Sequence, residues 1–240
     1  MKIDVLNFSG IYESEGFYKD LEEVRFLDLK DISGTNCMCD DAARDEIMKR
    51  IGDRLPYGLH FIDSGNYHYI SALYSEMIKE PFSLVVLDHH PDMQRPMFDI
   101  LSCGGWVLEV LDKNPYVRDV HIIGAAENLI KELDPDDRNR VHFYDQVDTG
   151  HLPETEYPVY LSIDKDVISR NEIVTNWDQG DAGWPEVLAF TKALLQRNVL
   201  AIDVCGECAP EQADCDLDKA IAQNDDFNKE LVYLVTGTTD

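Results

Sequence analysis

The feature that most constrains the fold of this chain is a regular alternation of short apolar runs with helix-like segments. The apolar runs are rich in β-branched residues and occupy residues 2–8, 24–29, 59–63, 83–87, 120–123, 141–144, 159–163 and 199–204. Helix-like stretches separate several of them, at residues 40–51, 67–79, 127–133 and 184–197. Such alternation predicts an α/β fold with a mainly parallel sheet.

Two of the apolar runs, residues 84–87 and 200–204, are almost continuously apolar. Strands of a parallel sheet have this pattern because helices cover both faces of the sheet. The chain has 240 residues, of which 44% are hydrophobic, so a large packed core can form. Because no internal repeat or linker is evident, we predict a single α/β domain over residues 1–240.

The charge of the chain limits the classes of partner. It has 21 Lys and Arg against 47 Asp and Glu, a formal net charge of −26. Nucleic acids and anionic membranes both require a basic surface, so neither is an expected partner. No stretch approaches the roughly 18 apolar residues of a membrane-spanning helix, and residues 1–10 lack a signal peptide's apolar segment. We expect a cytoplasmic protein whose six cysteines are reduced thiols.

Polar side chains suited to chemistry follow four of the predicted strands. They are His68, Asp88, His90, Asp92, Asp164, Asp166 and Glu207. In open α/β sheets, ligands bind just beyond the carboxyl ends of the strands. These side chains are therefore expected to open on one edge of the sheet.

The spacing of these carboxylates and imidazoles predicts a metal site. Residues two apart in an extended chain share a face, so Asp88, His90 and Asp92 would point the same way. The pair Asp164 and Asp166 would do likewise. Carboxylates gathered in one pocket repel each other and raise each other's pKa values, and one or two divalent cations would remove that repulsion. Carboxylates with imidazoles suit Mn²⁺, Fe²⁺ or Zn²⁺ better than Ca²⁺.

Four motifs resemble, in order, those of the ureohydrolase superfamily, which contains arginases, agmatinases and formiminoglutamases. The family patterns GGDHS, DAHxD, SxDxDxxDP and ExNP are matched by SGNYHY at residues 64–69, DHHPD at 88–92, SIDKDVIS at 162–169 and ECAP at 207–210. The resemblance implies a three-layer α/β/α fold of the arginase type. It also implies a binuclear manganese site at the carboxyl ends of the strands.

The resemblance further implies the role of each residue. It assigns six ligands to two Mn²⁺ ions per chain, with His68 and Asp92 on one ion, His90 and Asp166 on the other, and Asp88 and Asp164 bridging. Two such ions can share a water molecule and lower its pKa toward neutrality, so that it attacks a guanidinium or formimino carbon. Asp92 would accept the proton. Glu207 would pair with the substrate guanidinium, because a carboxylate matches that planar cation.

Departures from the family motifs bear on the substrate. Residues 207–210 lack the asparagine of ExNP, and residues 101–106 contain no histidine where arginases carry a proton-shuttling one. Polar side chains that would grip a free amino acid are not evident at residues 93–96. The predicted activity is therefore arginase-like hydrolysis of a C–N bond, releasing urea or a related product. Its substrate would be a cationic guanidino small molecule, or an arginine side chain in a peptide rather than free arginine.

Other functions stay open. The triplet Asp88-His89-His90 also resembles the DHH phosphoesterases, which use Mn²⁺, although no aspartate-rich motif follows residues 2–8. A zinc deacetylase of related fold would need only Asp88, His90 and Asp164. A non-catalytic metal-binding domain of the same fold is a third alternative.

Two further sequence features have more than one interpretation. The close cysteine pairs Cys37/Cys39 and Cys205/Cys208 could hold zinc if they met, but reduced thiols are the simpler interpretation. If the second pair flanks the pocket, it could make the site sensitive to oxidation. His89, between two predicted ligands, is expected to point away from the ions and to contact residues that orient the ligands.

Overall fold

An eight-stranded parallel sheet forms the centre of the computed structural model, which describes residues 1–240 except 53, 55, 211–214 and 238–240. The order in the sheet is β2-β1-β4-β10-β9-β5-β7-β8, and every neighbouring pair is parallel. The strands are β1 (Ile3–Asn7), β2 (Val24–Asp28), β4 (Leu59–Phe61), β5 (Phe82–Leu87), β7 (Val117–Ile123), β8 (His142–Tyr144), β9 (Val159–Asp164) and β10 (Val199–Cys205). These strands fall on the eight predicted runs, so the α/β class with a mainly parallel sheet is confirmed.

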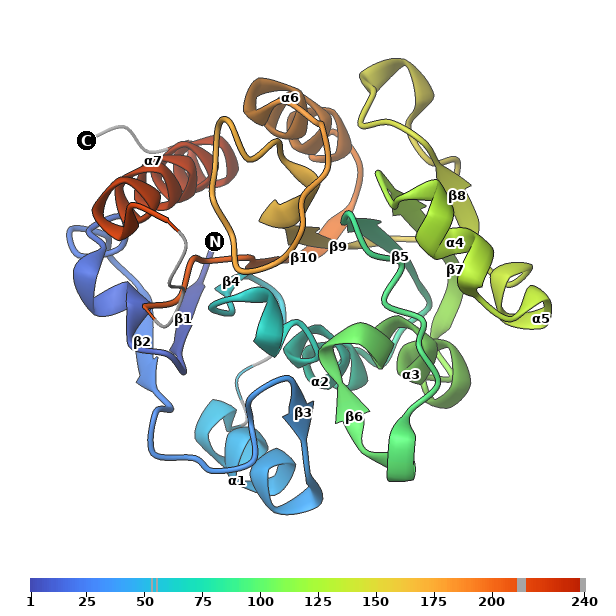
Figure 1. Cartoon of the computed structure of the whole chain (residues 1–240), viewed down its shortest axis with the longest axis horizontal. Helices are drawn as coiled ribbons and strands as arrows, with labels where there is room; N and C mark the ends of the chain where they lie inside the picture. The colour runs from blue at the N-terminus through green and yellow to red at the C-terminus, as the bar shows by residue number, and fades with distance from the viewer. Residues whose placement is uncertain (53, 55, 211–214, 238–240) are drawn as a thin grey trace.

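Helices cover both faces of the sheet (Figure 1). The α-helices are α1 (Asp41–Ile51), α2 (Ile70–Glu76), α3 (Trp106–Lys113), α4 (Glu127–Glu132), α5 (Pro135–Arg138), α6 (Trp184–Leu194) and α7 (Leu217–Thr236). Short 3-10 helices lie at Ile11–Ser14, Gly65–Tyr67, Met97–Asp99, Cys103–Gly105, Thr149–His151 and Lys165–Val167. Helices α1, α2 and α3 lie on one face, and α6 and α7 on the other. The three-layer α/β/α architecture is therefore confirmed.

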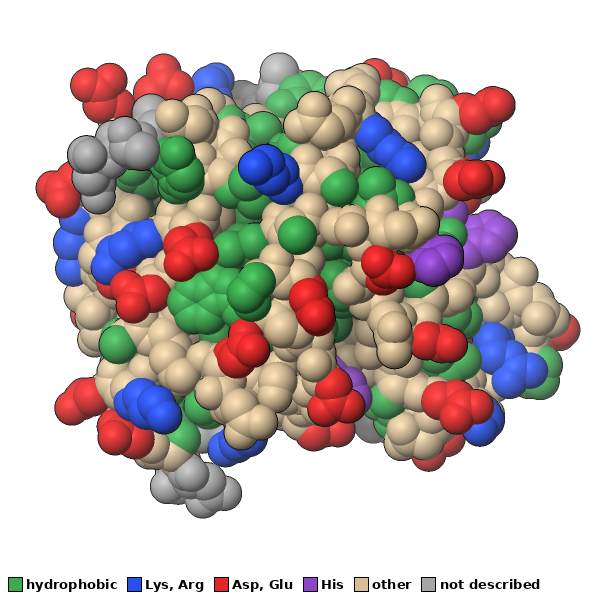
Figure 2. Space-filling model, turned by 90° about the horizontal axis from the view of Figure 1, so that it is seen from above, with side chains coloured by type: hydrophobic (Ala, Val, Ile, Leu, Met, Phe, Trp, Pro, Cys, Tyr) green, Lys and Arg blue, Asp and Glu red, His purple; other side chains and the backbone are tan. Residues whose placement is uncertain are grey.

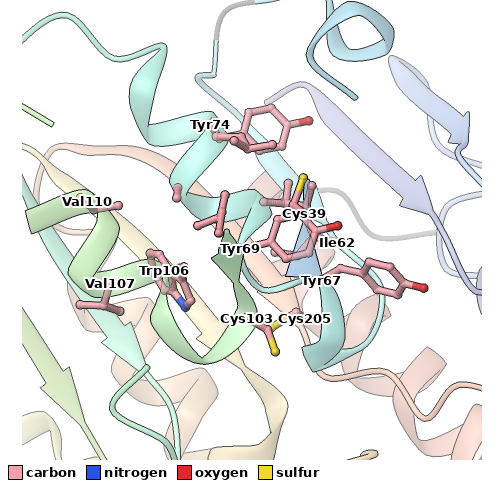
Figure 3. Packing of buried hydrophobic residues seen from close by; sticks show 14 of the residues in the cluster. Cys39, Ile62, Tyr67, Tyr69, Tyr74, Cys103, Trp106, Val107, Val110 and Cys205 are labelled. Atoms are coloured by element: carbon pink, nitrogen blue, oxygen red, sulfur yellow. The ribbon is translucent and has the colours of Figure 1, made fainter. Parts of the chain in front are cut away.

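Alternate side chains of each central strand enter two separate hydrophobic cores. In β5, Leu84 and Val86 pack with α1, α2 and α3, whereas Val85 and Leu87 pack with α6 and α7. Figure 3 shows the first core, where α3 presents Trp106 beside residues of α2. Burial on both faces explains why the strand sequences are almost continuously apolar.

Several elements were not among the predicted ones. Helices α3, α5 and α7 are additional, as is a small antiparallel sheet of β3 (Met38–Cys39) and β6 (Leu101–Ser102). In this small sheet the backbone N–H of Cys103 donates to the carbonyl of Cys37 at 2.9 Å. Within the part of the chain that the structure describes, no helix combines the length and apolar character needed to cross a bilayer.

Candidate metal centre

Four neighbouring strands of the sheet direct the predicted site residues to one edge. The strands β4, β10, β9 and β5 are adjacent in the sheet, and each is followed by at least one of those residues. Register places Cys205 of β10 opposite Asp164 of β9, and Leu87 of β5 opposite Ile163 of β9. Because the strands are parallel and in register, their carboxyl ends meet at a single level.

His68 lies between the 3-10 helix Gly65–Tyr67 and α2, and its imidazole is buried. Its Nδ1 atom lies 3.3 Å from Asp88 Oδ2, 3.1 Å from Asp92 Oδ2 and 3.4 Å from Asp164 Oδ2. Its other nitrogen, Nε2, lies 2.8 Å from the hydroxyl of Ser162 on β9. This contact fixes the ring so that Nδ1 faces three carboxylates at once.

Three predicted ligands lie in the loop after β5, which turns instead of continuing as an extended strand. The strand ends at Leu87, and Asp92 has a left-handed backbone with φ of 48°. The indole N–H of Trp106 donates to Asp92 Oδ2 at 2.8 Å and holds the carboxylate in place. The backbone N–H of His90 donates to Asp88 Oδ1 at 2.6 Å. A turn held by hydrogen bonds, rather than strand alternation, therefore gathers these side chains.

Asp164 and Asp166 bracket the turn from β9 into the 3-10 helix Lys165–Val167. Asp164 caps this helix, as a strand-end aspartate often does, because its carboxylate accepts the Asp166 N–H at 2.9 Å. Asp166 Oδ2 lies 2.8 Å from His90 Nδ1, and Asp166 Oδ1 accepts the His89 N–H at 3.0 Å. The His89 ring lies 3.8 Å from Asp178 and lines a separate cavity beside Gly180 and Asp181. Its backbone thus positions a predicted ligand.

The arrangement fits divalent cations. Three groups of candidate ligand atoms each lie within 4.8 Å of one another, namely His68/Asp88/Asp92, Asp88/His90/Asp166 and His68/Asp164/Cys205. Asp88 belongs to two groups, which suits a bridging carboxylate. His68 Nδ1 and Asp88 Oδ2 are buried without a hydrogen-bond partner. Buried polar atoms of this kind require a partner, and a cation between them would supply it. The six residues lie together, and their role as ligands stays a prediction.

The electrostatics of the cluster follow from its crowding. Burial raises the pKa of Asp92 to about 7, and the charge of Asp88 adds to the rise. Burial, then the charges of Asp164 and Asp88, raise the pKa of Asp166. Burial would lower the pKa of His90, but hydrogen bonds with Asp166 and Asp88 outweigh it and raise the pKa to about 12. His90 therefore keeps its proton at neutral pH, and Asp92 takes up a proton near pH 7, at positions that a cation could take.

Cys205 is a site residue that sequence reasoning did not place among the ligands. Its buried thiol donates to Asp164 Oδ2 at 3.0 Å, and its sulfur forms a group of three candidate ligand atoms with His68 and Asp164. Burial, followed by the charge of Asp164, raises the pKa of this thiol. The available signal was its position as the last residue of a strand, opposite Asp164. Trp106 and Trp177, which adjoin the cluster, gave no such signal.

The structure places Glu207 differently from its predicted role. Its side chain is fully buried, and its Oε1 atom lies 2.5 Å from the ammonium of Lys165. The amide of Asn228 on α7 donates to the same oxygen at 2.8 Å. Lys165, between two predicted ligands, points away from them and neutralises Glu207. In this arrangement Glu207 offers no exposed carboxylate to a substrate.

The cysteine pairs seen in the sequence do not assemble a zinc site. Cys208 Sγ lies 3.4 Å from Cys215 Sγ, and a hydrogen bond with Cys103 lowers the pKa of Cys37 to about 7. Among the described residues, no cluster of candidate ligands contains more than one cysteine.

A cavity of about 550 Å³ opens over the cluster and includes Asp88, His90, Asp92, Asp164 and Asp166 in its wall. Other parts of its wall come from the loop after β5, from helices α4 and α5 with the turn between them, from the small β3–β6 sheet and from Trp177 in the loop after β9. Acidic side chains also lie across the surface of the molecule (Figure 2). The cavity has the size of a small-molecule site and meets the cluster directly.

Comparisons with known proteins identify relatives and a fold. No protein-family model matches the chain. An uncharacterized protein of Thermotoga maritima is 31% identical over 212 residues, which cover 87% of this chain and 80% of the relative.

Solved structures with the same fold include the arginase of Bacillus subtilis, with a TM-score of 0.69 at 14% identity, covering 100% of this chain and 99% of that one. Proclavaminate amidino hydrolase of Streptomyces clavuligerus gives 0.68 at 15% identity, covering 98% and 91%. Formimidoylglutamase of Bacillus subtilis gives 0.67 at 15% identity, covering 95% and 86%. The fold implied by the sequence resemblance is confirmed.

Proposed function

This chain belongs to the same family as the uncharacterized Thermotoga maritima protein and has the ureohydrolase fold, and we propose that it is a binuclear manganese hydrolase acting on guanidino groups. The observation that carries this proposal is the pair of carboxylate–imidazole groups that share Asp88 at the carboxyl ends of the central strands. Arginase, agmatine ureohydrolase and amidino hydrolase of other organisms share the fold. Their names support a guanidino substrate here.

The residues of the centre would have different roles in the reaction. The six carboxylates and imidazoles would hold two Mn²⁺ ions, which would activate water and polarise the substrate. Ser162 orients the imidazole of His68, and Trp106 aims the carboxylate of Asp92 into the cluster. Asp92, whose carboxylate is held beside the cluster by the indole of Trp106, would accept the proton of the activated water.

We propose that the substrate is a guanidino small molecule or an arginine side chain in a peptide, rather than free arginine. The cavity wall contains Arg95, but that side chain is already paired with Asp137 at 2.6 Å. An amino acid's carboxylate would therefore have to compete with Asp137, and with Asp112 at 3.6 Å, for this guanidinium. The net charge of −26 would attract a cation.

The alternatives are less well supported. The structural comparisons favour the ureohydrolase fold, so the DHH phosphoesterase interpretation is not favoured. A single-zinc deacetylase would leave His68, Asp92 and Asp166 without a purpose at the centre. A non-catalytic metal-binding domain stays an alternative for the experiment to exclude.

The test combines metal content with product release. We expect about two Mn²⁺ ions per chain after loading in the wild type and about one in Asp166→Ala. The loaded wild type should release urea from N-acetylargininamide or an Arg-containing peptide faster than from free arginine, and Asp166→Ala should lose at least about 100-fold in kcat.

As a control, Asp226→Asn changes a mostly exposed carboxylate on α7, outside the cavity wall, and should keep both ions. Two ions without urea from agmatine, arginine, its amide or the peptide would indicate the non-catalytic alternative. Release of phosphate from a phosphoester would restore the DHH interpretation.

A further inference from the structure

A guanidinium group in this cavity needs a recognition partner other than Glu207. The carboxylate of Glu207 is fully buried and is not part of the wall of this cavity. Its Oε1 atom is held by Lys165 at 2.5 Å and by Asn228 at 2.8 Å, whereas its Oε2 atom has no hydrogen-bond partner. Freeing it would leave the ammonium of Lys165 buried and unpaired, which is strongly unfavourable. The partner must therefore be a group that already faces the cavity.

Trp177 is such a group. It lines the same cavity as Asp88, His90 and Asp164, and 38% of the residue is exposed. Its ring centroid lies 5.9 Å from that of the His90 imidazole, with the two planes at 71°. A partly exposed indole therefore stands directly beside a predicted ligand, in the wall of the cavity that opens over the centre.

The position of this indole is fixed by several contacts. Its Nε1–H donates to Asn66 Oδ1 at 3.0 Å, and its backbone N–H donates to Thr175 Oγ1 at 3.3 Å. The ring also lies close over Gly65, where an added Cβ would come within 2.8 Å of Trp177 Cδ1. A glycine at position 65 thus makes room for the indole.

The loop that carries Trp177 is tied to the centre from both sides. The side chain of Asn176 accepts the backbone N–H of Ala209, two residues after Glu207, at 2.8 Å. The exposed carboxylate of Asp178 lies 3.1 Å from His90 Nε2. The loop therefore places an aromatic face and a negative charge next to each other at the mouth of the cavity.

We propose that Trp177 is the specificity-determining residue for the substrate guanidinium, which stacks on its indole face. This inference rests on the proposed function and names the group that takes over recognition from Glu207. Tryptophan is the aromatic residue that attracts cations most strongly, and a planar guanidinium stacks on it better than a compact ammonium. A neutral ureido group lacks the charge and would bind less well.

The test uses the full chain loaded with Mn²⁺ and N-acetylargininamide as the probe, with the neutral N-acetylcitrullinamide for comparison. Trp177→Leu should raise KM for the arginine amide about tenfold and leave kcat within about twofold, because it removes binding common to substrate and transition state. Trp177→Phe should restore most of the affinity. Binding measured by calorimetry should favour the arginine amide over the citrulline amide in the wild type, and Trp177→Leu should abolish that preference.

Tryptophan fluorescence gives a readout that does not depend on turnover. Binding should change the emission of the wild type and of Trp184→Phe, a matched variant outside the cavity wall, but not that of Trp177→Phe. Two Mn²⁺ ions per chain and an unchanged unfolding midpoint would show that Trp177→Leu is folded. A Trp177→Leu protein with wild-type KM and preference, or with lost kcat and lost metal, would overturn the inference.

Different results would refute the proposed hydrolase activity and the proposed role of Trp177. Binding of the arginine amide through Trp177 without urea release would refute the proposed hydrolase and leave this inference standing. Urea release with an unchanged KM in Trp177→Leu would do the opposite. A wild type that binds neither amide would overturn this inference.

Discussion

Lys165 shows how one residue determines what its neighbours can do. It lies between Asp164 and Asp166, is fully buried, and projects away from both toward Glu207 and Asn228. Its ammonium also lies 6.0 Å from the ring centroid of Phe227. Burial of an ion pair is costly, and the pair is maintained only while both partners are present.

Replacement of Lys165 should therefore destabilise the protein strongly. Lys165→Met leaves the carboxylate of Glu207 buried without a counter-charge and should lower the free energy of unfolding by about 3–5 kcal/mol. Urea unfolding monitored by circular dichroism measures this loss. The double variant Lys165→Met/Glu207→Gln should recover much of it, because the unpaired charge is gone. Equal losses in the single and double variants would show that the pairing is not the cause.

For a single residue such as Lys165, the sequence predicted which way the side chain points but not which residues it contacts. Lys165 does point away from Asp164 and Asp166, as alternation predicted, but the reason differs. Asp164 ends β9 and Lys165 begins a 3-10 helix, so a turn rather than a continued strand separates the side chains. The partner of Lys165 comes from a distant strand end and from α7, so no local pattern could reveal it. The predicted role of Glu207 did not allow for that pairing.

Helix α7 illustrates what is missed at the scale of elements. Asp216 caps it by accepting the Lys219 N–H at 3.2 Å, and Phe227 and Leu231 face the core. A run of polar residues precedes those apolar ones, so its helical periodicity is weak until the partner surface is known. The two-residue strands β3 and β6 are even harder to predict, since their pairing is non-local and offers almost no pattern of its own.

A single side chain of α7 anchors the N-terminal segment. Asp225 Oδ1 accepts the N–H groups of Gly16 at 2.8 Å and Phe17 at 2.7 Å. Asp225→Ala should lower the free energy of unfolding by about 2–3 kcal/mol, because two hydrogen bonds to a charged acceptor are lost. Its neighbour provides the control, since Asp226 is mostly exposed and Asp226→Ala should cost less than about 0.5 kcal/mol. Similar midpoints for both variants in urea unfolding would contradict this account.

For the whole molecule, the strands could be predicted from sequence but their order could not. All eight apolar runs became strands. For the central strands the reason is burial on both faces, which leaves a local pattern, whereas the edge strands β2 and β8 are only partly buried. The insertion of β9 and β10 between β4 and β5 depends on long-range packing, which no single run encodes. The site could still be predicted, because every parallel strand ends at the same edge whatever the order. That argument requires only that the strands run parallel, and it does not require their order.

The same convergence of charges makes stability depend on pH and on metal. The pKa of Asp92 is raised from an ordinary 3.8 to about 7, and that of His90 from 6.5 to about 12. A raised pKa in the folded state adds stability below the unfolded value, which is lost as pH rises through the folded value. Metal-free protein should therefore become less stable from about pH 6 to about pH 8. Ordinary surface carboxylates are already ionised over that range.

Mn²⁺ should reverse this trend, because the cation takes the positions of those protons. At a concentration of 100 times Kd, one site stabilises the fold by about 2.7 kcal/mol, and Kd itself should fall as pH rises. The increase in Tm caused by Mn²⁺ should consequently be larger at about pH 8 than at about pH 6. Differential scanning calorimetry at constant ionic strength measures it, with Asp92→Asn as the variant whose response to pH is flatter. An increase in Tm that is equal at both pH values, or larger at the lower one, would mean that protons and metal do not compete at this centre.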